Sequence, residues 1–146
     1  MRSTVLSKKQ LSLLIDDCIQ DVKGNGGIKV QSLGNLFRTV GMINKDNTIV
    51  ALSSPLTSAG MVLTWFGISG VMSMLTPDVR QKYEKMLDLS SKELAELLAM
   101  LKEELCERRQ ERAAKVIEII ARLDALWIKL DEEISLLKTH SAESET

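Results

Sequence analysis

The chain has 146 residues, of which 45% are hydrophobic, 3% aromatic and 27% charged, and its formal net charge is -1. This length and apolar content suit one domain, or a small helical domain at 1–76 with a helical extension, and they exclude a disordered polypeptide. A near-neutral total charge argues against a dedicated nucleic-acid binder, and the scarcity of aromatic residues, Gly and Pro argues against an all-β sandwich, so we expect an all-α fold.

The first predicted helix covers residues 8–21. Ser7 and Gln10 have the spacing of an N-terminal capping box just before it. Apolar side chains then recur at i, i+3, i+4, i+7 and i+8, which is the period of one helical face. They are Leu11, Leu14, Ile15, Cys18 and Ile19. The sequence Gly-Asn-Gly-Gly at 24–27 predicts the end of this helix.

A second helix is predicted at about 32–40, after a short extended piece at 28–30. Ser32 is its candidate N-cap, and Gly41 is placed to end it. The next residues, 42–52, combine turn-forming side chains with a β-branched Thr-Ile-Val sequence. We therefore expect a linker or a short strand there.

Asp21, Lys23, Asn25, Gly26 and Ser32 lie between and around the ends of the first two predicted helices. With these residues at their centre, residues 6–41 resemble the first helix-loop-helix of calmodulin and myosin light chains, the EF-hand superfamily. The resemblance covers about a quarter of the chain. In that family, loop positions 1, 3 and 5 supply oxygen ligands and position 12 a bidentate Glu. The matching residues here are Asp21, Lys23, Asn25 and Ser32. A cation at one ligand position and the loss of the Glu imply a calcium-independent adaptor that holds a target helix in a groove.

Residues 47–77 form an uncharged run of 31 residues, which has two interpretations. The stretch 60–76 is close to the shortest length that spans a membrane, and its Ser, Thr and Gly content suits helix packing in lipid. Alternatively, it is the central helix of a soluble core, covered on all sides. The candidate membrane or core side chains are Val62, Leu63, Trp65, Phe66, Ile68, Val71, Met72 and Leu75.

The region 77–140 is predicted to be helical or coiled-coil. Thr76 and Pro77 indicate a helix start, and the predicted helix at 77–88 is followed by a longer one that begins with a capping box at Ser90 and Glu93. Neither Gly nor Pro occurs from there to residue 138, so one continuous helix would be roughly 70 Å long. It either projects or folds back as a hairpin near 107–112.

Apolar residues of this region alternate spacings of 3 and 4 in two heptad blocks separated by a stutter. We predict that this face binds a second copy or a protein partner. It consists of Leu94, Leu98, Leu101, Leu105, Ile120, Leu123, Trp127, Leu130, Ile134 and Leu137. The alternative is that these helices pack on their own domain. Further apolar residues broaden the stripe beyond a two-stranded seam and favour a bundle of three or more helices.

The sequence names no catalytic, cofactor-binding or metal-binding residue. Cys18 and Cys106 are expected to be free thiols in a reducing compartment, and a disulfide between them is the alternative. The single histidine, His140, is too isolated for a zinc site or a Cys-His pair. The first ten residues are polar and basic, so we expect no secretory signal there. Residues 141–146 are predicted to form a short disordered tail.

We therefore expect a non-catalytic intracellular protein, cytoplasmic or membrane-associated, that self-associates or docks a protein partner through its helices. No cofactor and no nucleic acid is expected among its ligands. The alternative is a protein that inserts into, or associates with, membranes through residues 58–75.

Overall fold

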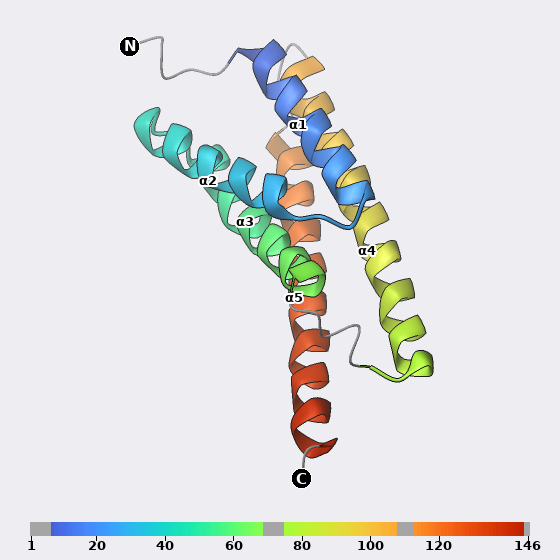
Figure 1. Cartoon of the computed structure of the whole chain (residues 1–146). Coiled ribbons are helices and arrows are strands. Elements are labelled where there is room, and N and C mark those ends of the chain that lie inside the picture. Colours follow the sequence, from blue (N-terminus) through green and yellow to red (C-terminus); the bar gives the residue numbers. More distant parts are fainter. Residues whose placement is uncertain (1–6, 69–74, 108–112, 145–146) are drawn as a thin grey trace.

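A computed structural model describes residues 7–68, 75–107 and 113–144 (Figure 1). Every regular element in these ranges is a helix, which confirms the predicted all-α class. The elements are α1 (Lys8–Lys23), α2 (Ile28–Ile43), α3 (Asn47–Ile68), α4 (Pro77–Lys102), a π-helical turn η3 (Glu103–Glu107) and α5 (Ala113–Ser144).

The helices form two antiparallel hairpins and one further helix (Figure 1). α2 and α3 pack along each other, α3 also lies on α5, and α1 lies along α4. The turn that joins α2 and α3 points away from α1, α4 and α5, so the α2–α3 hairpin projects as an arm (Figure 1). Buried side chains from all five helices form one hydrophobic core at the base of this arm.

The beginning of α1 confirms the predicted capping box. The Gln10 backbone N–H donates to Ser7 Oγ at 3.1 Å, and the Ser7 backbone N–H donates to Gln10 Oε1 at 3.2 Å. The predictions for α2 are wrong at both ends, because the helix begins at Ile28 and continues through Gly41 to Ile43. Gly41 is buried against Val50 of α3. It therefore serves close helix packing and does not end the helix.

The predicted linker or strand at 42–52 is also wrong, because α3 begins at Asn47. Asp46 explains the difference: its Oδ1 accepts from the backbone N–H groups of Thr48 at 3.1 Å and Ile49 at 3.2 Å. A side chain that satisfies the first free N–H groups of a helix stabilises that helix start, and here it overrides the β preference of Thr, Ile and Val.

Small residues bring the backbones of α2 and α3 into direct contact. A Cβ atom on Gly34 would lie 2.6 Å from the backbone N of Thr57 and 2.9 Å from the carbonyl O of Ser53. A Cβ atom on Gly60 would lie 2.6 Å from the carbonyl O of Gly27. No real Cβ approaches backbone atoms this closely, so the present spacing of the two helices depends on glycine at these positions.

The C-terminal region folds back on itself, which settles the open choice in favour of a hairpin. Arg122 of α5 lies 3.8 Å from the carboxylate of Glu93 and 3.6 Å from the sulfur of Met100, both on α4. The predicted helix start at Pro77 is confirmed, whereas the predicted break before Ser90 is wrong. Ser90 is buried in the middle of one continuous helix. α5 extends to residue 144, into the segment predicted to be a disordered tail.

Candidate functional site

The residues predicted to bind a partner lie mostly inside the core of the chain itself. Those that expose at most 5% of their surface are Leu94, Leu98, Leu101, Leu105, Leu123, Leu130 and Ile134. Ile120 and Trp127 are partly buried against the same core, and the side chain of Leu137 lies outside the described residues. The chain's own helices cover most of this face, and binding of a partner through it stays a prediction.

The predicted membrane or core segment contributes to the same core where it is described. Val62 and Leu63 are buried, and Trp65 and Leu75 are partly buried against the core. The side chains of Phe66, Ile68, Val71 and Met72 lie outside the described residues. Residues 47–65 of α3 are long and apolar enough to cross a membrane, and 44% of this stretch is buried. Core helices of soluble proteins meet the same criterion, so length and composition alone carry no membrane assignment.

The two cysteines are free thiols, as predicted. Cys18 is buried, and its Sγ donates to the carbonyl O of Lys29 at 3.3 Å. Burial raises the pKa of Cys18 to about 11, with the carboxylates of Asp21 and Asp17 adding to the shift. Burial also raises the pKa of the half-buried Cys106. A thiol that keeps its proton is a poor nucleophile, so neither cysteine has the environment of a catalytic one.

The residues of the EF-hand-like segment are split between two helices. Asp21 and Lys23 belong to the last turn of α1, Ser32 belongs to α2, and only residues 24–27 connect the helices. The Asp21 carboxylate accepts from the backbone N–H of Lys29 at 3.3 Å. In the part of the chain that the structure describes, no group of three His, Cys, Asp or Glu side chains could hold a metal ion. The EF-hand resemblance stays a prediction.

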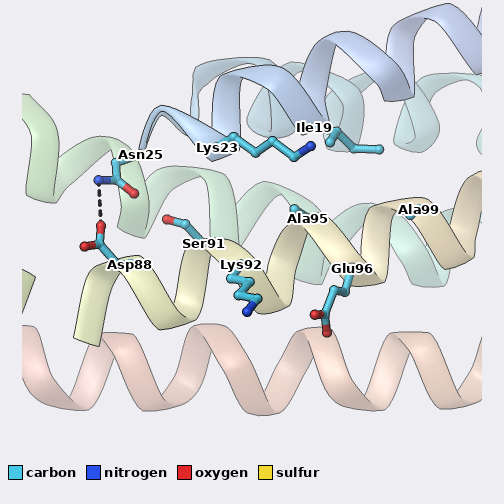
Figure 2. A pocket seen from close by; sticks show the side chains of 9 residues that line it. All are labelled: Ile19, Lys23, Asn25, Asp88, Ser91, Lys92, Ala95, Glu96 and Ala99. Carbon is cyan, nitrogen blue, oxygen red and sulfur yellow. Dashed lines mark hydrogen bonds between the residues drawn. The ribbon is translucent and has the colours of Figure 1, made fainter. Parts of the chain in front are cut away.

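A cleft of about 540 Å³ lies between α1 and α4 (Figure 2). Asn25 Nδ2 donates to Asp88 Oδ1 at 3.1 Å at one end of it. The Ser91 hydroxyl is buried without a hydrogen-bond partner among the described residues. The charged side chains of Lys92 and Glu96 extend to the other side of α4 (Figure 2). Lys23 and Asp88 also line the cleft, and among the described residues none of its four charged side chains forms an ion pair with another.

The tip of the projecting arm exposes two large apolar side chains. Met42 is 62% exposed and Ile43 is 55% exposed, directly before the turn that contains Lys45. The sequence prediction missed this feature because it placed both residues in a linker. The sequence signal for this exposed site was a pair of apolar residues, Met42 and Ile43, outside any predicted helical face and close to Lys45.

The arm is positively charged. α2, α3 and their turn carry Lys29, Arg38 and Lys45, against the single acidic residue Asp46. The Asp46 carboxylate already accepts two backbone N–H groups at the start of α3. The side chains of Arg38 and Lys45 are exposed, so the tip presents cations beside exposed apolar side chains.

A second exposed apolar stripe follows the outer side of α5. Ile117 is 62% exposed and Ile128 is 43% exposed, and Ala121 and Ala125 are exposed between them. Spacings of three and four residues place these side chains on one side of the helix, opposite its buried face.

Models of known protein families, curated proteins and solved structures were compared with this chain, and none of them matches it. The geometry of the chain itself therefore has to indicate the function. The arm tip is the site that this geometry favours, because it combines projection, apolar exposure and positive charge.

Proposed function

We propose that the protein is a non-catalytic, membrane-associated protein that docks on anionic membrane surfaces with the tip of its α2–α3 arm. The observation that carries the proposal is the exposure of Met42 and Ile43 at the end of the arm, beside Lys45. Apolar side chains flanked by basic ones are the composition of segments that lie in the membrane interface.

The expected binding is weak and reversible. Moving two half-exposed apolar side chains out of water is worth about 3 kcal/mol. Each basic residue close to an anionic surface adds about 1 kcal/mol, and Arg38 and Lys45 are both exposed near the tip. This sum is comparable to that of a single lipid chain, which holds a protein to a membrane only transiently.

The distance between Arg38 and Ile43 along α2 matches the depth at which interfacial side chains enter a membrane. Ile43 lies five residues beyond Arg38 in α2, which is about 7.5 Å along a helix. Interfacial segments bury their apolar side chains about 5–10 Å into the boundary between headgroups and acyl chains. When Met42 and Ile43 reach that boundary, Arg38 stands at the level of the lipid phosphates.

The intact arm is poorly suited to crossing the membrane. Arg38 lines a cleft together with side chains from residues 50–58 of α3, within the stretch 47–65 that a spanning helix would place in the membrane. A spanning α3 would therefore carry Arg38 into the hydrocarbon core, at a cost of up to about 3 kcal/mol at the bilayer centre. α2 has 16 residues and is about 24 Å long, shorter than the hydrocarbon core of about 30 Å. Because α2 packs closely on α3 at Gly34, an α3 that crosses the membrane would take α2 into the membrane with it.

Flotation with lipid vesicles tests this proposal. Wild-type protein is mixed with vesicles of phosphatidylcholine, with or without phosphatidylserine, and centrifuged in a density gradient. We expect flotation with the anionic vesicles and its loss in the Met42→Asp, Ile43→Asp double variant. Met61→Asp is the matched control, since Met61 is 53% exposed but lies on α3, away from the tip. A wild-type protein that stays at the bottom of the anionic gradient contradicts the proposal.

Self-association through the outer stripe of α5 is a second candidate function. The exposed Ile117 and Ile128, with small alanines between them, form an apolar helix face that a second copy could cover. Sedimentation equilibrium tests it: the Ile117→Lys, Ile128→Lys variant is expected to sediment as a monomer and the wild type as a dimer. A monomeric wild type at all concentrations contradicts this candidate.

A further inference from the structure

A second cleft lies on the arm itself, between α2 and α3, with a volume of about 350 Å³. All but one of the side chains that line it are polar, which is unusual next to an uncharged apolar helix. The lining residues are Asn35, Arg38, Val50, Ser53, Ser54, Thr57 and Ser58.

Arg38 is the charged group of this cleft. It has no ion-pair or hydrogen-bond partner within the described residues. The single acid of the arm, Asp46, is occupied by the first N–H groups of α3. A guanidinium group offers five donors in a planar fork that matches two oxygens of a phosphate. The cleft therefore holds a positive charge that no described residue compensates.

The hydroxyl groups complete the donor set. Ser53 and Thr57 donate to α3 carbonyl groups at 2.6 Å and 2.8 Å, so their hydrogens are engaged. The hydroxyls of Ser54 and Ser58 and the amide of Asn35 have no such partner among the described residues. Each of these three groups can donate to an oxygen that Arg38 does not reach.

We propose that this cleft binds a phosphate group, with Arg38 on two of its oxygens and Ser54, Ser58 and Asn35 as further donors. The volume exceeds that of a phosphate ion, which leaves room for the molecule that carries the group. Lipid headgroups and soluble phosphomonoesters share this chemistry. The inference rests on the proposed membrane function only where the phosphate belongs to a lipid.

Titration of the full chain, followed by amide chemical shifts in NMR spectra, tests the site with two soluble probes. These are inorganic phosphate and glycerol 3-phosphate. We expect saturable shifts around Arg38, Ser54 and Ser58, and an affinity about tenfold lower in Arg38→Ala, because one charge-assisted bidentate contact is lost. Arg38→Lys is expected to recover part of the affinity, since it keeps the charge but not the fork.

Lys29→Ala is the matched control, because it removes one positive charge from the same helix outside the cleft. We expect its phosphate affinity to stay within twofold of wild type. An equal loss in Lys29→Ala and Arg38→Ala would show diffuse charge attraction and overturn the site. Absence of saturable shifts with both probes would overturn it as well. Circular dichroism spectra identical to wild type show that the Arg38 variants remain folded.

The source of the phosphate and the membrane proposal are separated by flotation of the same variants. If Arg38→Ala floats less with vesicles containing phosphatidic acid and also binds soluble phosphate less tightly, the phosphate belongs to a lipid headgroup. Soluble phosphate binding by a protein that does not float assigns a phosphomonoester and contradicts only the membrane proposal. Flotation that is unchanged in Arg38→Ala, without soluble phosphate binding, contradicts only the phosphate site.

Discussion

Replacing Gly34 by alanine is expected to destabilise the protein, although alanine is the better helix former. In a helix interior, alanine is favoured over glycine by about 1 kcal/mol. Here the added Cβ would lie 2.6 Å from the backbone N of Thr57 and 2.9 Å from the carbonyl O of Ser53. Backbone atoms cannot move aside as a flexible side chain can, so α2 and α3 have to separate. Overpacking of this kind costs typically 1–3 kcal/mol and more where the backbone must shift.

The overpacking cost is expected near the upper end of this range, because backbone atoms have to move, and the helix preference of alanine offsets about 1 kcal/mol of it. We therefore expect a net loss of about 1–2 kcal/mol in the free energy of unfolding of Gly34→Ala, which for a chain of this length is a decrease in Tm of roughly 3–7 °C. Urea unfolding followed by circular dichroism measures it. Gly24→Ala is the control, because the nearest atom to its Cβ, the carbonyl O of Asp21, lies 3.5 Å away. A Gly34→Ala variant as stable as Gly24→Ala would refute the close contact of α2 and α3.

Three further predictions follow from local contacts. Asp46→Ala removes the acceptor at the start of α3 and is expected to lower the free energy of unfolding by about 1 kcal/mol in the same urea assay. Burial raises the pKa of Cys18 in the folded chain to about 11, from an ordinary value of 9.0. The contribution of this thiol to the free energy of unfolding is therefore fully present below pH 9 and is lost between pH 9 and 11. In Cys18→Ala, the decrease in the free energy of unfolding between pH 9 and 11 is expected to be smaller by about 2–3 kcal/mol. Iodoacetamide should label Cys106 well before Cys18 in the folded wild type, as measured by mass spectrometry of digests. Leu123→Lys buries a charge at a fully buried position and should unfold the chain, whereas Ile128→Lys at an exposed one should change stability by about 0.5 kcal/mol or less, both measured by thermal melting.

The helical class and the first helix followed directly from the sequence, because apolar period and capping agree in residues 7–19. The sequence prediction failed where glycine and β-branched residues had a tertiary use. Gly41 has the position of a helix stop, yet α2 continues to Ile43, and Gly41 is buried against Val50 of α3. Such a contact depends on a partner helix that local sequence patterns do not reveal.

The heptad pattern predicts helix packing but does not identify the partner helix. Leu94 and Leu123 have the spacing of an intermolecular seam, but both are fully buried within one chain. The spacing of apolar residues is the same for packing within one chain and between two chains, because a helix that folds back covers the same apolar face as a helix of a second chain. The arm tip was missed for a related reason. Exposure of Met42 and Ile43 results from the projection of the whole hairpin, which is a property of the fold.

Labels at two positions test the central claim most directly. An environment-sensitive fluorophore such as NBD is attached to a cysteine at position 43 or 61, in a chain that carries Cys18→Ala and Cys106→Ser. With phosphatidylserine-containing vesicles, we expect a blue-shifted emission that lipid-borne quenchers suppress for the label at 43 and unchanged emission for the label at 61. Unchanged emission at both positions would contradict membrane docking. A shift at both positions would contradict docking by the tip and assign α3 itself to the membrane.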